Sequence, residues 1–257
     1  MAQDPEFAKL AGESPGLERI AGGFHRTGGP VFSRRGYLLF CDQPERIMKW
    51  ERGKLTVYRE KSNGARALTF DHQGRLLACE AGRVTRTGKD GSITVLARTG
   101  GEPADLVYSI DGSVYFTQGA EVLQIAPRGK PRTVARDLPG AAAGVALAPN
   151  QQHLYVSCSG AVRRYRIAPD GALTEGRTFA ELPGAAGGLK TDEAANVWVA
   201  TPAGVRVFNR AGRLLGTVTL PEAPGNCNWG EGFRNLYITA QTSVYRLETT
   251  SSGTRTY

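Results

Sequence analysis

The sequence has few of the residues from which metal centres and nucleophile sites are commonly built. Its four cysteines, Cys41, Cys79, Cys158 and Cys227, stand far apart and form no C-x-x-C pair. Neither a zinc site nor a compact disulfide framework is therefore indicated, and we expect buried free thiols. Of the three histidines, His153 falls in a turn between apolar segments, where we expect it at the surface.

Long hydrophobic runs are also missing. No apolar stretch approaches the roughly 18 residues that a membrane-spanning helix needs, so we expect no membrane partner. The opening residues, MAQDPEF, lack the basic start and apolar centre of a signal peptide, and the sequence leaves the compartment open. Hydrophobic residues make up 40% of the chain and charged residues 22%, which is typical of a folded globular protein.

Acidic residues are in the minority, with 24 aspartates and glutamates against 32 lysines and arginines, for a formal net charge of +8. Such an excess invites a nucleic-acid interpretation. The basic residues, however, are spread in short groups such as SRR, PRGKPR and VRRYR, without a basic helix or interleaved stacking aromatics. We therefore expect solvated turns and strand edges, and no nucleic-acid partner.

What the chain does contain is an internal repeat, marked by two sets of segments that recur every 38 to 44 residues. The first set is GGPVF, RALTF, ADLVY, AGVAL, GGLKT and NCNWG, beginning at Gly28, Arg66, Ala104, Ala143, Gly187 and Asn226. The second set is YLLFCD, LLACE, VYFTQ, LYVSC, VWVAT and LYITA, ending at Asp42, Glu80, Gln118, Cys158, Thr201 and Ala240.

Turns and further strands complete each repeat. A turn such as DHQG or SIDG joins the two markers, a third strand such as RVTRT follows, and a fourth such as SITVLAR completes most units. Four short strands about every 40 residues are the signature of a β-propeller blade. We therefore predict an all-β, six-bladed β-propeller with four antiparallel strands per blade, formed as one domain by residues 1–257.

The sixth repeat stops after its third strand and a polar tail, ETTSSGTRTY. Ahead of the first repeat, the segment GLERIAG at residues 16–22 supplies an extra strand. We predict that this strand completes the last blade and closes the ring, which removes an open sheet edge that would invite association. We accordingly expect a monomer.

In a propeller the first strand of each blade lies innermost, so the six residues that begin the first markers are predicted to ring one mouth of a central pocket. Four of the six are glycine or alanine, and only Arg66 and Asn226 carry polar side chains. The second-marker residues Asp42, Glu80 and Gln118 are predicted to approach the same pocket. Asp105 follows its ring position by one residue, so strand alternation is expected to point it away from the axis.

The segments GPVFSRRGYLLFCD, LTFDHQGRLLACE, GLKTDEAANVWVATPAGVRVFNRAGRLLGTV and NCNWGEGFRNLYITA resemble the senescence marker protein, gluconolactonase and luciferin-regenerating enzyme family of six-bladed propellers. The resemblance covers essentially the whole chain. It implies calcium or zinc at the axis, polarising a lactone or ester carbonyl and activating water. The implied ligand positions hold Gly28, Ala104, Ala143 and Gly187 here, so we expect no metal cofactor.

Two functions remain open. In the first, the chain is a gluconolactonase-like propeller without the usual metal site, and its open pocket takes a small molecule through Arg66, Asn226 and Gln118. An arginine at a former cation position favours an anionic or carbonyl-bearing ligand; the competing interpretation is an ion pair of Arg66 with Glu80 or Glu102. The alternative function is a metal-dependent lactone or ester hydrolase with a non-standard ligand set, drawn from Asp42, Glu80, Glu102, Asp105 and Asn226.

The origin of the four glycine and alanine residues at the implied ligand positions, called here the glycine and alanine column, is open as well. Deliberate removal of four ligands in an engineered variant and natural divergence to a protein without the metal would leave the same residues.

Overall fold

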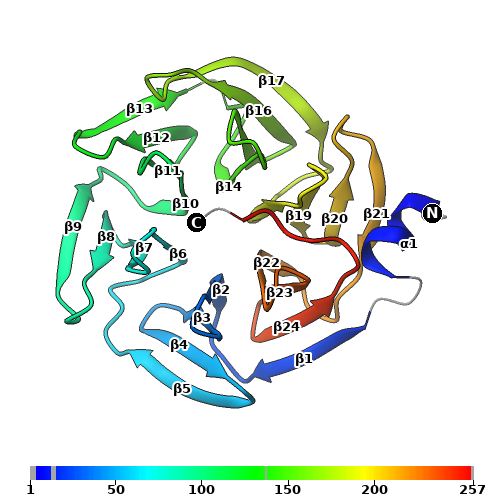
Figure 1. Cartoon of the computed structure of the whole chain (residues 1–257), viewed down its shortest axis with the longest axis horizontal. Coiled ribbons are helices and arrows are strands. Elements are labelled where there is room, and N and C mark those ends of the chain that lie inside the picture. The colour runs from blue at the N-terminus through cyan, green and yellow to red at the C-terminus, as the bar shows by residue number, and fades with distance from the viewer. Residues whose placement is uncertain (1–3, 13–15, 137, 256–257) are drawn as a thin grey trace.

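The computed structural model describes residues 4–12, 16–136 and 138–255. Six four-stranded antiparallel sheets stand around a central axis (Figure 1), which confirms the predicted six-bladed propeller. Residues 1–3, 13–15, 137 and 256–257 of the predicted domain lie outside the described residues.

In blades one to five the strands follow chain order from the axis outward (Figure 1). Blade one consists of β2 (Thr27–Ser33), β3 (Tyr37–Asp42), β4 (Arg46–Glu51) and β5 (Lys54–Arg59). Blade two consists of β6 (Ala67–Phe70), β7 (Leu76–Glu80), β8 (Arg83–Thr87) and β9 (Ile93–Arg98). Blade three consists of β10 (Pro103–Tyr108), β11 (Val114–Gln118), β12 (Glu121–Ile125) and β13 (Pro131–Ala135).

The second half of the ring follows the same plan. Blade four consists of β14 (Ala142–Leu147), β15 (His153–Cys158), β16 (Ala161–Ile167) and β17 (Leu173–Glu181). Blade five consists of β18 (Leu189–Thr191), β19 (Val197–Thr201), β20 (Gly204–Phe208) and β21 (Leu214–Val218). Blade six consists of β22 (Pro224–Gly230), β23 (Asn235–Ala240), β24 (Ser243–Glu248) and, from the start of the chain, β1 (Leu17–Gly22).

The pairing of β1 with β24 closes the ring, as predicted from residues 16–22. The two strands are antiparallel, with Leu17 opposite Leu247 and Gly22 opposite Ser243. Strand β24 is thus paired on both sides. The start of the chain completes the last blade, and main-chain hydrogen bonds close the ring.

The inner strands begin close to the six predicted positions. Four of those residues lie inside β2, β10, β14 and β22, whereas Arg66 and Gly187 stand just before β6 and β18. Pairing nevertheless continues past the short strand β18, because the amide of Gly187 donates to the carbonyl of Ala200 and the amide of Ala200 donates to the carbonyl of Gly188.

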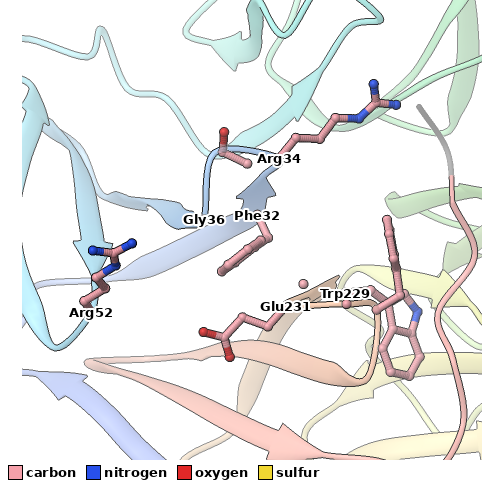
Figure 2. A pocket seen from close by; sticks show the side chains of 10 residues that line it. Phe32, Arg34, Gly36, Arg52, Trp229 and Glu231 are labelled. Atoms are coloured by element: carbon pink, nitrogen blue, oxygen red, sulfur yellow. The ribbon is translucent and has the colours of Figure 1, made fainter.

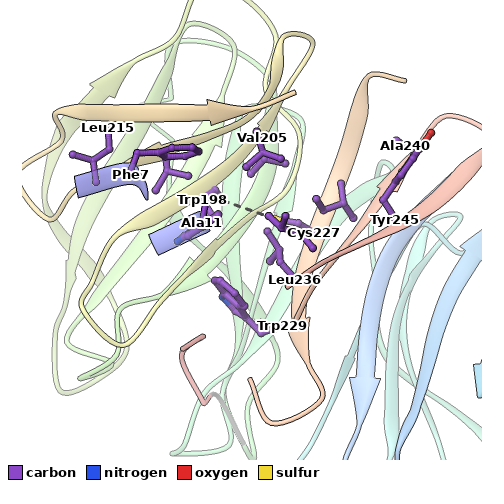
Figure 3. Close-up of a cluster of buried hydrophobic side chains, with 14 residues drawn as sticks. Phe7, Ala11, Trp198, Val205, Leu215, Cys227, Trp229, Leu236, Ala240 and Tyr245 are labelled. Atoms are coloured by element: carbon purple, nitrogen blue, oxygen red, sulfur yellow. Dashed lines mark hydrogen bonds between the residues drawn. The ribbon is translucent and has the colours of Figure 1, made fainter. Parts of the chain in front are cut away.

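The core is divided among hydrophobic clusters between neighbouring blades. Between blades five and six, the buried rings of Trp198 and Trp229 meet edge to face, with centroids 5.3 Å apart (Figure 3). Cys227 lies in the same cluster, and all four cysteines are buried free thiols, as predicted. Burial raises the pKa of the Cys227 thiol to about 12.

One short helix, which the sequence analysis missed, departs from the all-β pattern. Helix α1 (Pro5–Ala11) is capped by Asp4, whose carboxylate accepts from the amide of Glu6. The helix lies against β21 with Phe7 buried. Its Leu10 carbonyl accepts the amides of Thr250 and Ser251, so the helix also holds the start of the C-terminal tail. Among the described residues no helix is long and apolar enough to cross a membrane.

The C-terminal tail, residues 249–255, runs toward the axis (Figure 1). Gly253 pairs with Asp192 as an isolated antiparallel bridge, and the hydroxyls of Thr191 and Thr254 are hydrogen-bonded over 2.9 Å. Asp192 is fully buried and accepts hydrogen bonds from the Ser251 hydroxyl and the Trp198 indole. The tail is therefore built into the end of the propeller at which β18 terminates.

The position of Phe7 generates a stability prediction. Because its ring packs against Gly216 and is 1% exposed, Phe7→Ala should lower the free energy of unfolding by about 3 kcal/mol. Lys9→Ala, at an exposed position of the same helix, should change it by less than about 0.5 kcal/mol. Urea denaturation followed by circular dichroism measures both, and equal losses would contradict a specific packing role for Phe7.

Candidate functional site

All six ring residues line one pocket of about 410 Å³ around the axis. The inner strands bring them together, as the repeat predicts: Gly28, Arg66, Ala104, Ala143, Gly187 and Asn226. Four of them contribute only a hydrogen atom or a methyl group, so the side-chain chemistry at this level belongs to Arg66 and Asn226.

The pocket also contains residues that the sequence analysis did not predict. Further lining residues come from segments next to the ring positions or from the ends of the second markers and the residues just after them: Arg26, Thr27, Gln43, Thr201 and Pro202. A Cβ on Gly28 would lie 2.6 Å from Nε2 of Gln43, so the Gln43 amide fills the space beside that glycine. In the sequence Gln43 directly follows the second-marker residue Asp42, and this position could have identified Gln43 as a pocket residue.

Asp42, Glu80 and Gln118, by contrast, do not line this pocket, which corrects their predicted position. Asp42 accepts from the amide of His25 at 2.9 Å and pairs with Arg46 at 2.7 Å. The Asp42 carboxylate therefore binds a backbone amide and an arginine of the fold, and not a ligand in the pocket.

Glu80 shows the same use of a strand-end carboxylate. Its fully buried side chain pairs with Arg59 at 2.6 Å and Arg83 at 2.7 Å, and accepts the Thr85 hydroxyl at 2.8 Å. Gln118 lies against Gly101 instead, its Nε2 being 3.2 Å from where a Cβ on that glycine would stand. All three second-marker side chains are thus directed to neighbouring segments of the fold.

Arg66 combines both of its predicted alternatives. It lines the pocket, and its Nη2 also donates to the carboxylate of Glu102. The side chains of this pair are 33% and 52% exposed, so the ion pair is open to solvent and to competition by a ligand. Nε of Arg66 is buried and has no hydrogen-bond partner among the described residues.

A buried polar cluster adjoins Asn226, and it overturns the expected orientation of Asp105. Oδ2 of Asp105 accepts the amide of Val145 at 3.1 Å and lies 3.9 Å from Nζ of Lys190, while Oδ1 accepts from the Asn226 amide at 3.5 Å. The register between β10 and β11 shifts between Pro103 and Leu106. This bulge interrupts strict alternation, which is why Asp105 faces blades four, five and six.

The electrostatics of the cluster are set mainly by burial. Burial raises the pKa of the Asp105 carboxyl above its usual value, while the charge of Lys190 and the hydrogen bond from Val145 act in the opposite direction. Asp105 is therefore held as a partner of a protein ammonium group and a backbone amide, and all of its contacts are internal.

The residues present do not fit calcium or zinc at the positions that the resemblance implies. Those four positions carry no donor side chain, and a Cβ on Gly187 would lie 2.2 Å from the carbonyl oxygen of Gly225. Of the alternative ligand set, only Asp105 and Asn226 come together, because Asp42, Glu80 and Glu102 pair with arginines. Nor do three His, Cys, Asp or Glu side chains converge anywhere in the described part of the chain.

A second cavity, of about 550 Å³, lies between the far ends of β2 and β22. Figure 2 shows Phe32 and Glu231 in the middle of the lining residues, with Arg52 on one side and Trp229 on the other. Its principal groups serve the fold: Phe32 stacks on Tyr237 at 5.3 Å, the Trp229 indole donates to the Thr191 carbonyl, and Glu231 pairs with Arg246. We therefore place the candidate site at the axial pocket.

The close approach of Gly187 to blade six yields a second prediction. Gly187→Ala should lower the free energy of unfolding by about 1–3 kcal/mol, because the new methyl group collides with a backbone carbonyl. Gly225→Ala is the matched control, since the nearest atom to its Cβ would be 3.9 Å away. Thermal and urea denaturation compare the two, and a Gly187→Ala variant as stable as Gly225→Ala would refute the close contact.

The Asp105 cluster yields a prediction on pH. Because its pKa is raised in the folded state, the folded protein binds more protons than the unfolded chain above the ordinary aspartate pKa. The stability of the wild type relative to Asp105→Asn should therefore fall as pH rises from about 4 towards neutrality. Urea denaturation at a series of pH values measures the free energy of unfolding of both proteins. The contributions of titrating groups that both proteins share cancel in the difference. A difference that increases with pH would reverse the assigned cause.

Comparisons with known proteins agree with this architecture. The model of the SMP-30/Gluconolactonase/LRE-like region matches residues 27–242. A gluconolactonase of Zymomonas mobilis is 25% identical over 305 aligned positions, which cover 97% of this chain and 85% of the relative. Because that alignment is longer than the 257-residue chain, the relative contains segments that this chain lacks.

Solved structures show the same fold. A gluconolactonase of Xanthomonas campestris superposes with a TM-score of 0.87 at 25% identity, over 96% of this chain and 94% of that one. A regucalcin of Agrobacterium tumefaciens, described as a calcium-binding protein, superposes with a TM-score of 0.78 at 14% identity, over 92% and 95%. With its six blades, its ring of inner-strand residues and a family match across most of its length, the chain belongs to the SMP-30/gluconolactonase/LRE-like family.

Proposed function

We propose that the protein binds a small polar molecule with a carbonyl or carboxylate group, of the lactone or sugar-acid class, in the axial pocket and without a divalent metal. The observation that carries this proposal is the composition of the ring: four positions without functional side chains beside one guanidinium and one amide. The volume of about 410 Å³ is within the range of small-molecule sites. The names of the relatives from Zymomonas mobilis and Xanthomonas campestris supply the ligand class.

Arg66 is the principal recognition group in this proposal. A guanidinium offers several donors in a planar fork that suits carboxylate oxygens. The buried Nε of Arg66 has no protein partner among the described residues, and the Glu102 pair is solvent-exposed. A ligand oxygen would satisfy that donor, while the Asn226 side chain, also at the pocket wall, orients the ligand.

Divergence is the origin we propose for the glycine and alanine column. Removing a ligand side chain from an intact metal site leaves the space that the side chain occupied. At Gly187 that space is taken by the Gly225 carbonyl, and beside Gly28 it is taken by the Gln43 amide. This close packing around the small residues supports a diverged family member over an engineered deletion.

Isothermal titration with gluconolactone and with gluconate tests the binding proposal. We expect saturable binding that Arg66→Ala and Asn226→Ala each weaken by about tenfold or more, as loss of a charged or buried hydrogen bond predicts. Arg136→Ala is the matched control, because it removes another exposed arginine, paired with Glu121 at 3.1 Å. If both pocket variants bind as the wild type does, the pocket assignment is wrong.

A metal titration separates this proposal from the second candidate, a metal-dependent lactone or ester hydrolase, which the relatives' names favour. Calcium, zinc and manganese should leave the melting temperature unchanged, since a ligand stabilises a protein only by binding its folded form. Differential scanning fluorimetry with and without a chelator measures this. A metal-dependent rise together with chelator-sensitive lactone hydrolysis would establish the hydrolase instead.

A further inference from the structure

A basic groove lies between blades four and five, at the end of the blades opposite the axial pocket. Its volume is about 510 Å³. Strand β14 begins beside the axial pocket at Ala142 and ends at Leu147, and the turn that follows it, Ala148–Asn150, lines the groove. Turn residues 193–195 and 210–211 of blade five form the other wall. The basic side chains that line it are His153, Arg164 and Arg210.

Like charges face each other beside this groove. Arg164 on β16 stands directly opposite Arg177 on β17, so both side chains leave the same face of the sheet. Two arginines in this relation repel each other and destabilise a strand pair. Neither forms an ion pair with an acidic side chain in the described part of the chain, and the same holds for Arg210. The repulsion is therefore uncompensated within these residues.

The acidic residues nearby are already engaged. Glu175 pairs with Arg166 at 3.1 Å, and Glu193, at the rim of the groove, lies 3.8 Å from Arg255. Arg164 itself has a buried Nε–H without a hydrogen-bond partner among the described residues. A buried donor of this kind is costly unless something accepts its hydrogen bond.

His153 completes the group. It was expected at the surface, but it is the first residue of β15, half-buried, with Nε2 2.9 Å from Nη2 of Arg164. Since an arginine only donates, Nε2 accepts, and the imidazole is neutral in this arrangement. Burial, followed by the charges of Arg164, Arg177 and Arg166, lowers the pKa of His153.

We propose that the groove binds a phosphate or sulfate group carried by a small molecule. A tetrahedral oxyanion has enough acceptor oxygens to take the orphan Nε–H of Arg164, the fork of Arg210 and a proton on His153 together. Its negative charge also relieves the repulsion between Arg164 and Arg177. The site is separate from the axial pocket and does not depend on the function proposed for it.

Binding at this site is coupled to protonation of His153. The charged groups around its ring are Arg164, Arg166, Arg177 and Glu175 of blade four, with Glu193 and Arg210 at the facing wall. A bound dianion reverses the local potential and favours the imidazolium form. Sulfate should therefore bind more tightly at pH 6 than at pH 8, and it is the suitable probe because its own charge is constant over that interval.

Nuclear magnetic resonance and thermal shift together test the proposal. With only three histidines in the chain, the His153 signal is identified by a His153→Gln variant, and its pKa in the wild type should rise when sulfate is added. Millimolar sulfate should raise the melting temperature above that in chloride of equal ionic strength. Arg164→Met should lose this rise. Arg163→Met should keep it, because this substitution removes the same charge from the opposite face of the same strand.

A third variant tests the repulsion directly. Arg177→Thr should raise the melting temperature in buffer without sulfate or phosphate, because it removes a like charge from the strand pair, and it should weaken the response to sulfate. A lower melting temperature would show that Arg177 is held by contacts within the fold and would contradict the proposal.

Two further outcomes overturn the assignment. If Arg163→Met and Arg164→Met lose the sulfate response equally, the effect is one of overall charge and not of a site. If the pKa of His153 in the wild type is unmoved by saturating sulfate, no oxyanion binds beside it, and this measurement holds even if Arg164→Met fails to fold.

Glucose 6-phosphate should bind more tightly than inorganic phosphate, because the groove is larger than one oxyanion; equal affinity would refute a carrier molecule.

Discussion

The close approach of neighbouring inner strands at the axis is the constraint on which the candidate site depends. A Cβ on Gly187 would lie 2.2 Å from the carbonyl of Gly225, and one on Gly144 would lie 2.6 Å from the Cα of Gly188. Blades four, five and six therefore meet backbone against backbone at this level. The same closeness that forbids side chains there lets Asp105 of blade three reach the amide of blade four and the ammonium of blade five.

The fold could be predicted from the sequence because each blade is encoded by a local strand pattern, and the same pattern recurs six times along the chain. The markers predicted the six inner strands, and a spare strand at residues 16–22 predicted ring closure with β24. Asp105 was misplaced because a bulge in β10 changes side-chain direction without leaving a clear sequence signal. The strand-end carboxylates were misplaced because their arginine partners, such as Arg59 for Glu80, come from other strands.

Arginine partnership also explains where the positive charge of the chain gathers. Asp42, Asp71 and Glu80 are buried and pair with arginines of the same or the preceding blade. These pairs use three acidic residues of blades one and two within the fold. In blade four the strand register instead places Arg164, from the run VRRYR, opposite Arg177 beside the groove. Strand register thus places side by side two arginines that are well separated in the sequence.

The two faces of the propeller are lined by different residues. The axial pocket opens at the end where the inner strands begin, whereas at the other end the tail bonds to Asp192 and Thr191, and Gly253 lies against the Trp229 ring. Between them a small space of about 20 Å³ lies beside Lys190 and Thr254. We therefore expect a ligand in the axial pocket to enter and leave by the mouth at which the inner strands begin.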